Sequence, residues 1–131
     1  MDPEELDFPD TLVLTVESPD AAREGAVEAA ETAEDGGRTA AVRSFADVTE
    51  FRKLLTPRRV EVVQSLIDEP APSIRALADR LERSYADVHE DLETLADYGV
   101  VYYREEGRSK APVVPYTSVE IEGTVAEARP V

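Results

Sequence analysis

Residues 56–99 read TPRRVEVVQSLIDEPAPSIRALADRLERSYADVHEDLETLADYG, and this stretch decides the fold. It holds three short amphipathic segments, which begin at Thr56-Pro57, at Ser73 and at Ser84. A serine or threonine hydroxyl accepts from the free amides of a helix start, and proline at the first helical position loses only a donor that had no partner. The stretch therefore predicts three consecutive helices, the last over residues 84–98.

Apolar residues recur at helical spacing in each segment, which predicts one buried face per helix. The predicted stripes are Val60, Val63, Leu66 and Ile67, then Ile74, Leu77, Ala78 and Leu81, then Val88, Leu92, Leu95 and Ala96. Only residues 82–84 separate the second and third segments. Gly99 follows the third segment, at the position where a helix commonly ends with a glycine in the left-handed conformation. Two helices joined by so short a break indicate a helix-turn-helix.

A β-hairpin is expected directly after the third helix. Residues 100–104 are β-branched and aromatic, which favours a strand, and residues 105–110 form a polar turn with a glycine. The return strand, residues 112–116, carries two prolines and therefore suits the edge of a sheet. A hairpin over residues 100–116 beside a helix-turn-helix is a wing.

The N-terminal part predicts a small β-α-β extension. Residues 11–17 alternate as a strand does, Ser18-Pro19 begins a helix that runs to residue 34, and residues 39–45 read as a second strand. Strand, helix and strand in this order suit a parallel pair. Because two strands bury little surface, we expect the extension to complete its sheet against a partner chain, which predicts a homodimer.

The fold class is therefore α+β, a winged helix-turn-helix domain with a small N-terminal extension. Residues 1–55 are the expected extension, in which Asp47 caps a short helix that leads to residue 56. Residues 56–125 are the expected winged-helix domain, with a last strand at 119–125. Residues 1–10 are expected to be a loose tail, and residues 126–131 a flexible one.

The charge balance is strongly acidic. The chain has 29 acidic and 14 basic residues, a formal net charge of −15, and eight of the bases lie within residues 56–110. Excess acid repels phosphate, although screening by salt shortens the reach of distant charges and leaves a local basic strip effective. The composition, with scarce lysine, resembles that of haloarchaeal proteins adapted to salt. The other interpretation is a protein that binds no DNA.

Several classes of function find no support in the residues. Cysteine is absent, so disulfides and thiol catalysis are excluded. A single histidine without clustered ligands makes no metal site, and no glycine-rich phosphate loop or GxSxG motif occurs, so we expect neither an enzyme nor a cofactor. No apolar run is long enough to span a membrane, which favours a cytoplasmic protein.

Two stretches carry a resemblance to a known family. Residues 73–81, SIRALADRL, and residues 88–101, VHEDLETLADYGVV, resemble MarR/ArsR-type winged helix-turn-helix regulators. The likeness is greatest to archaeal predicted transcriptional regulators with a short N-terminal extension, some encoded beside RelE-type toxins, and it covers residues 48–122. The resemblance implies sequence-specific binding of double-stranded DNA, usually by a homodimer, and it raises a toxin or another protein as a partner.

In such regulators the third helix enters the major groove with its N-terminal residues at the base edges. Ser84 caps this helix and can also contact DNA. Tyr85 either contacts bases or phosphate or packs against the second helix. His89 either bonds to a base edge or phosphate or is simply solvated.

The basic residues fall into two candidate groups. Phosphate contacts are expected from the arginines that flank the turn, whose alternative is ion pairing on the surface: Arg75, Arg80 and Arg83. Contacts to the backbone or minor groove are expected from the wing, where charge alternatively protects a sheet edge: Arg104, Arg108 and Lys110.

The third helix departs from the family pattern because its expected exposed positions are acidic. These positions are Asp87, Glu90, Asp91 and Glu93. A carboxylate can accept from cytosine N4, but near phosphate it lowers affinity. The acidic helix therefore keeps open the alternative of a protein-interaction module, or an antitoxin-like partner, on the same fold.

Overall fold

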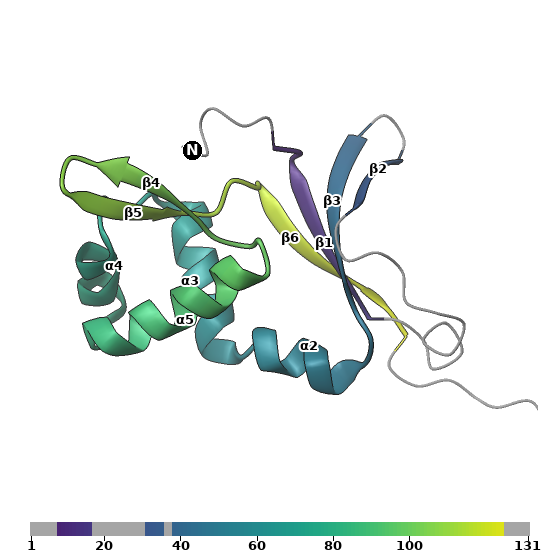
Figure 1. Ribbon diagram of the computed structural model, residues 1–131, viewed down its shortest axis with the longest axis horizontal. Helices are drawn as coiled ribbons and strands as arrows, with labels where there is room; N and C mark the ends of the chain where they lie inside the picture. The colour runs from purple at the N-terminus through teal and green to yellow at the C-terminus, as the bar shows by residue number, and fades with distance from the viewer. Residues whose placement is uncertain (1–7, 17–30, 36–37, 125–131) are drawn as a thin grey trace, which may run out of the picture. The chain divides into compact units, whose positions relative to one another are not determined.

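The computed structural model describes residues 8–16, 31–35 and 38–124. The chain divides into two compact units. Of the described residues, one unit contains Phe8 and residues 54–117, and the other contains residues 9–16, 31–35, 38–53 and 118–124. The first unit is the winged helix-turn-helix, and the second is built on a small β-sheet (Figure 1).

The three predicted helices are confirmed in the first unit. They are α3, Pro57–Asp68; α4, Ile74–Leu81; and α5, Tyr85–Asp97. Each begins at its predicted cap, where a hydroxyl oxygen accepts from the backbone amide three residues later: Thr56 from Arg59, Ser73 from Ala76, and Ser84 from Asp87. These bonds satisfy donors that lack partners inside the helix, so each cap determines where its helix begins.

The turn between α4 and α5 depends on a residue that the pattern did not single out. Glu82 has φ 55° and ψ 45°, a left-handed conformation, and its amide donates to the carbonyls of Ala78 and Asp79. Among the described residues it is the one non-glycine residue with positive φ. The left-handed residue ends α4 abruptly, so that only Arg83 and Ser84 remain before α5 begins.

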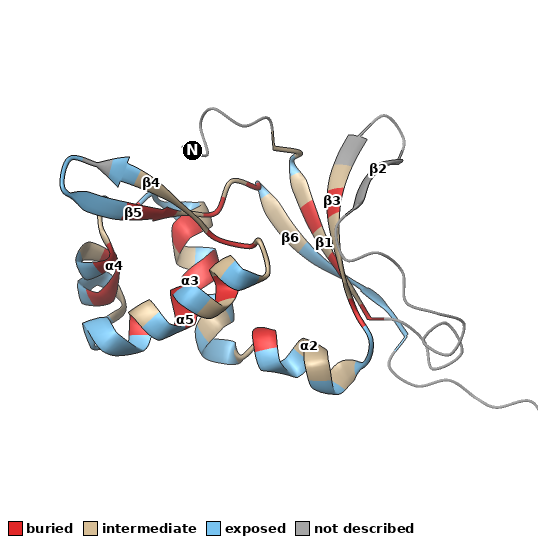
Figure 2. Cartoon of the chain, in the orientation of Figure 1, coloured by how far each residue is buried: buried red, intermediate tan, exposed pale blue. Residues whose placement is uncertain are grey.

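The core of this unit lies between the apolar faces of α3, α4 and α5 (Figure 2). Leu77, Leu92 and Leu95 are completely buried, as predicted. The predicted apolar stripe of α3 was wrong at one position: Val60, which was expected to be buried, is 47% exposed, whereas Val62 is 0% exposed. The buried face of α3 is therefore turned toward Val62, Val63 and Leu66.

The wing is a hairpin of β4, Tyr102–Glu106, and β5, Ser109–Val113, paired antiparallel. Both strands lie nearer the tip than predicted, because the turn needs only Gly107 and Arg108. Gly107 has φ 61°, which suits the first central position of a type II′ hairpin turn. Residues 100–101, predicted as strand, are buried just before β4.

An N-terminal residue packs against the base of the wing. The Phe8 ring lies 4.8 Å from the Tyr102 ring and 5.8 Å from the Tyr116 ring, measured between centroids. The Tyr116 hydroxyl donates to the carbonyl oxygen of Gly99 at 3.1 Å. The expectation of a loose tail was therefore wrong at Phe8, while residues 1–7 lie outside the described part of the chain.

The second unit contains a four-stranded sheet in the order β2-β3-β1-β6 (Figure 1). Its strands are β1, Thr11–Val16; β2, Glu31–Asp35; β3, Arg38–Phe45; and β6, Ser118–Gly123. β1 pairs parallel with both β3 and β6, and β2 pairs antiparallel with β3. Alternate residues of β1 are buried, which gives the sheet one apolar face. Helix α2, Val48–Leu54, follows β3 and begins at the predicted cap Asp47.

The sheet confirms one prediction for the extension and corrects two. The strands at 11–16 and 38–45 do lie side by side and parallel. The helix predicted over residues 19–34 is wrong at residues 31–34, which belong to β2, and residues 17–30 lie outside the described part. The place expected for a partner chain's strand is taken by the chain's own β6, so residues 118–123 belong with the N-terminal unit rather than with the predicted 56–125 domain.

The last residues, 125–131, also lie outside the described part, so the flexible tail predicted at 126–131 stays a prediction. Within the described ranges, no helix has the length and apolar character needed to cross a membrane.

The contrast between Val60 and Val62 yields a test of the core. Val62→Ala removes two methyl groups from a completely buried site and should lower the free energy of unfolding by about 2 kcal/mol. Val60→Ala, on the same helix but half exposed, should change it by less than about 0.5 kcal/mol. Urea unfolding at constant potassium chloride measures both, and equal losses would contradict this orientation of α3.

Candidate functional site

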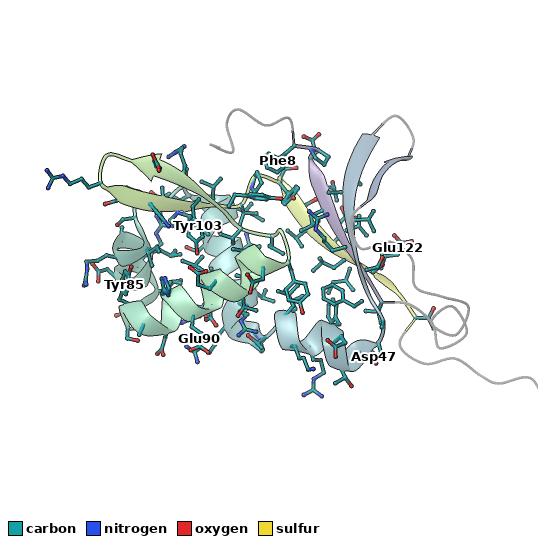
Figure 3. All side chains as sticks on the ribbon, viewed as in Figure 1. Phe8, Asp47, Tyr85, Glu90, Tyr103 and Glu122 are labelled. Carbon is teal, nitrogen blue, oxygen red and sulfur yellow. The ribbon has the colours of Figure 1, made fainter. Side chains whose placement is uncertain are left out.

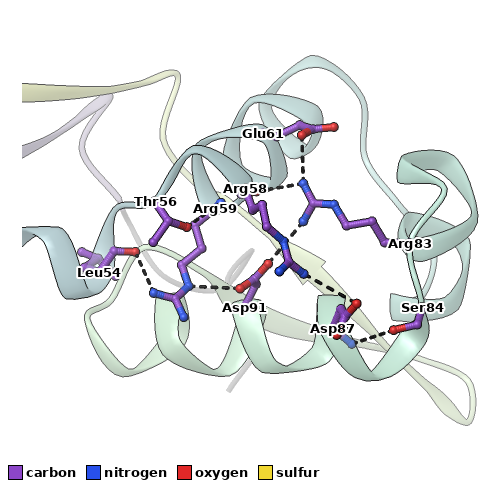
Figure 4. Close-up of polar contacts among 9 residues, drawn as sticks. All are labelled: Leu54, Thr56, Arg58, Arg59, Glu61, Arg83, Ser84, Asp87 and Asp91. Carbon is purple, nitrogen blue, oxygen red and sulfur yellow. Dashed lines mark hydrogen bonds and ion pairs between the residues drawn. The ribbon is translucent and has the colours of Figure 1, made fainter.

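Asp91 carries a buried charge at the centre of the winged unit (Figure 4). It is 6% exposed; its Oδ1 accepts from Arg59 Nε at 3.1 Å and its Oδ2 from Arg83 Nη1 at 3.2 Å. The expectation that Asp91 is exposed was wrong. A buried carboxylate needs opposite charge and hydrogen bonds, and here α3 and the turn before α5 supply both. The pairs therefore fasten α5 to α3 and to the turn.

Arg83 makes two further hydrogen bonds inside the same cluster. Its Nη2 donates to the carbonyl oxygen of Arg58 at 3.1 Å and to Glu61 Oε2 at 2.9 Å. The Arg83 side chain is only 13% exposed. Arg83 therefore has a structural role, in which its partners are Asp91 and Glu61 rather than Asp87, and its predicted phosphate contact stays a prediction. Asp87 instead pairs with Arg58 at 3.6 Å, and both side chains are exposed.

Arg80 is also held within the fold. Its guanidinium donates to the carbonyl oxygens of Ser65, Glu69 and Pro70 at 3.3, 2.9 and 2.9 Å. Carbonyls at a helix C-terminus lack intrahelical donors, and a nearby cation satisfies them. Arg80 therefore caps the end of α3, and its predicted phosphate contact stays a prediction.

A groove with a volume of about 600 Å³ lies between α4, α5 and the wing. It brings together five of the predicted site residues: Arg75, Tyr85, His89, Arg108 and Lys110. Glu93 and Tyr103 also line it, and neither was predicted as a site residue. Ser84 and Arg104 are not among its lining residues; Ser84 caps α5, and Arg104 lies half-buried in β4.

At one end of the groove an aromatic pair lies under a cation. The Tyr85 and His89 rings stack with centroids 5.8 Å apart and planes at 19°, and the Arg75 guanidinium lies 5.5 Å from the Tyr85 centroid. Tyr85 remains 43% exposed, so it is not buried against the second helix. Figure 3 shows Tyr85 at the start of α5. The stack holds Tyr85 and Arg75 in place while leaving them accessible.

At the other end a carboxylate joins α5 to the wing. Glu93 Oε1 lies 3.3 Å from His89 Nε2 and accepts from the Tyr103 hydroxyl at 3.5 Å. Lys110 Nζ lies 5.8 Å from the Tyr103 ring centroid. Burial raises the pKa of the Tyr103 phenol, and the negative charge of Glu93 adds a smaller increase. The phenol therefore stays protonated and keeps its donor toward Glu93.

Simple spacing could have suggested Glu93, because it follows His89 by four residues on a helix and such pairs face each other. Tyr103 had no comparable signal, because its approach to α5 depends on where the wing folds back. Within the described residues, no group of three or more histidine, aspartate or glutamate side chains is placed to hold a metal ion.

Comparison with known proteins gives one matching family and several similar solved structures, including one from Mycobacterium bovis and one from Vibrio cholerae. The HVO_A0114 family model matches residues 54–121. A homodimeric winged helix-turn-helix DNA-binding domain from Mycobacterium bovis, a possible ArsR-family transcriptional regulator, is 22% identical with a TM-score of 0.46; the match covers 52% of this chain and 63% of that one. Reduced HlyU from Vibrio cholerae is 25% identical with a TM-score of 0.45, and the match covers 51% and 70%. No curated protein matches the chain significantly.

The buried cluster yields a stability test on α5. Asp91→Asn leaves Arg59 and Arg83 largely buried without a carboxylate and should lower the free energy of unfolding by about 3 kcal/mol. Glu90→Gln removes a charge from the neighbouring exposed position and should change it by less than about 0.5 kcal/mol. Thermal and urea unfolding provide the values. An Asp91→Asn protein as stable as Glu90→Gln would rule out the cluster as the fastening of α5.

Proposed function

The chain belongs to the HVO_A0114 family, and from that premise we propose that it is a sequence-specific, DNA-binding transcription regulator. The observation that carries the proposal is the groove, in which basic side chains from α4 and the wing flank the exposed rings of α5. A duplex would place its major groove against the N-terminal half of α5, with the wing on the backbone or in the minor groove.

Phosphate contacts are assigned to cations that are accessible from the groove. Arg75, Arg108 and Lys110 are exposed and come from α4, from the hairpin turn and from β5, respectively. Such contacts position a protein on the duplex without reading its sequence. Arg104, beside them on the wing, and the hydroxyl of Ser84 remain candidates for further backbone contacts. Arg80 and Arg83 are not assigned phosphate contacts in this proposal because each makes several hydrogen bonds within the fold.

Base contacts are assigned to Tyr85 and His89. Both lie in the first half of α5, where this architecture meets base edges, and both side chains are more than two-fifths exposed. An imidazole can donate to or accept from a base edge, and a tyrosine ring can pack against a thymine methyl. These two residues would therefore set sequence preference.

The overall acidity is compatible with this assignment. Three of the four acids named on α5 remain exposed, whereas Asp91 is buried and neutralised by Arg59 and Arg83. In concentrated salt the Debye length falls to about 3 Å, so the distant carboxylates contribute little while direct contacts persist. With about three phosphate contacts, the logarithm of the binding constant should fall with that of salt with a slope of about −3.

We propose further that the regulator acts as a homodimer in the cytoplasm. Many helix-turn-helix proteins bind paired half-sites, and the matched Mycobacterium bovis domain is described as homodimeric. Analytical ultracentrifugation of the full chain in molar potassium chloride should give twice the chain mass of 14.4 kDa. A single species at the chain mass would contradict the dimer.

DNA binding itself is tested by selection from random-sequence duplexes with the untagged full chain, in molar and in decimolar potassium chloride. The proposal expects enrichment of one motif and saturable fluorescence anisotropy with that duplex. A folded protein that enriches no motif and binds no duplex at either salt would refute it. That outcome would favour the protein-interaction alternative, for which the exposed Asp87 and Glu90 provide an acidic surface.

Substitutions separate positioning from sequence readout. Arg75→Ala and Arg108→Ala should weaken binding to all duplexes alike and reduce the salt slope by about 1 each. His89→Ala should instead change which motif is enriched, at a cost of about 1–3 kcal/mol for the preferred base. Arg52→Ala, on α2 and outside the groove, removes the same charge and serves as the control. Equal effects of all three arginine substitutions would contradict the assigned surface.

A further inference from the structure

His89 is the one histidine of the chain, and it lies in the groove beside a carboxylate. Its Nε2 is 3.3 Å from Glu93 Oε1, and both side chains are about half exposed. An imidazole of ordinary environment changes charge between about pH 5 and pH 8. The Glu93 pair is therefore a neutral contact or a salt bridge, depending on whether His89 carries a proton.

The groups around His89 carry charges of both signs. On its own helix, the Glu93 carboxylate lies against the imidazole and Tyr85 stacks on the ring, whereas the exposed Glu90 is the next residue along the helix and has no contact with the imidazole among those observed. From α4 comes Arg75, and from the wing come Arg108, Lys110 and the neutral phenol of Tyr103. The three cations of α4 and the wing oppose a further positive charge in the groove.

We propose that DNA binding in this groove is coupled to protonation of His89, whose imidazolium then neutralises the Glu93 carboxylate. The inference rests on the proposed function, because it describes how the same groove accepts a polyanion. Phosphates placed against Arg75, Arg108 and Lys110 cancel their repulsion and add attraction for the imidazolium. The complex therefore holds more protons than the free chain.

The direction of the pH effect follows from linkage. If the complex binds more protons than the separate components, lowering the pH stabilises the complex. The charged pair also removes a repulsive carboxylate from the face that meets phosphate, and the Tyr103 hydroxyl already donates to the same oxygen. Affinity for DNA is thus high on the acidic side of neutrality and falls as the pH rises.

The first test measures anisotropy with the enriched duplex from about pH 6 to about pH 8, at constant potassium chloride, with the untagged full chain. The dissociation constant should rise about three- to tenfold over this interval. This is the change expected if the complex holds a fraction of one proton more than the separate components. His89→Gln keeps a hydrogen-bonding group but does not titrate, so its dissociation constant should be independent of pH. Glu90→Gln, the matched charge control, should keep the wild-type dependence.

Glu93→Gln separates protonation from a direct base contact by His89. In Glu93→Gln no carboxylate repels the phosphates, so DNA binding no longer requires a protonated His89 to neutralise it. Binding at about pH 8 should then be tighter than that of the wild-type chain, with a smaller pH dependence. Looser binding by Glu93→Gln at that pH would contradict the repulsive role given to this carboxylate.

Proton NMR gives a direct reading, because one histidine yields one imidazole Cε1 proton signal. Its midpoint in a pH titration should move to higher pH when the duplex is added. A midpoint that does not move, together with a pH-independent dissociation constant, would overturn this inference and leave DNA binding intact. Absence of DNA binding at every pH would instead overturn the proposed function, and this inference with it.

Discussion

The burial of one carboxylate constrains the rest of the winged unit. Asp91 is 6% exposed on α5, and its two oxygens are held by Arg59 of α3 and Arg83 of the turn. Desolvation makes such an ion pair a modest source of net stability, yet removing one partner leaves buried charge without compensation. The helices must therefore keep the relative placement that lets both arginines reach Asp91, and α5 is presented in one orientation.

This constraint also determines which cations remain for a ligand. Arg59, Arg80 and Arg83 are committed to the fold, at the centre of the helices and at the end of α3. The accessible cations of α4 and the hairpin tip face a shared groove with the exposed rings of α5. The buried Asp91 carboxylate is neutralised by Arg59 and Arg83, whereas the cations of the groove remain accessible. An acidic chain can therefore still present positive charge locally.

Predictions from the sequence succeeded where the cause is local. The caps Thr56, Ser73 and Ser84 bond to amides three residues away, so composition and spacing alone indicate them. The burial of Asp91 had a local signal too, since it stands three residues after Val88, within the buried stripe of α5. Its partner Arg59 is 32 positions away, however, and no periodicity reports that contact. The pairing of β6 with β1 is hidden for the same reason, because it joins strands more than a hundred residues apart.

The central claim is that the groove between α5 and the wing receives DNA while the Asp91 cluster stays internal. Chemical-shift mapping of backbone amides and arginine side chains, during titration with an enriched duplex, tests it most directly. The claim predicts large shifts at Arg75, Tyr85, His89, Arg108 and Lys110, and little change in the side-chain signals of Arg59 and Arg83. Shifts concentrated at Arg59, Arg80 and Arg83, with the groove residues unchanged, would contradict it.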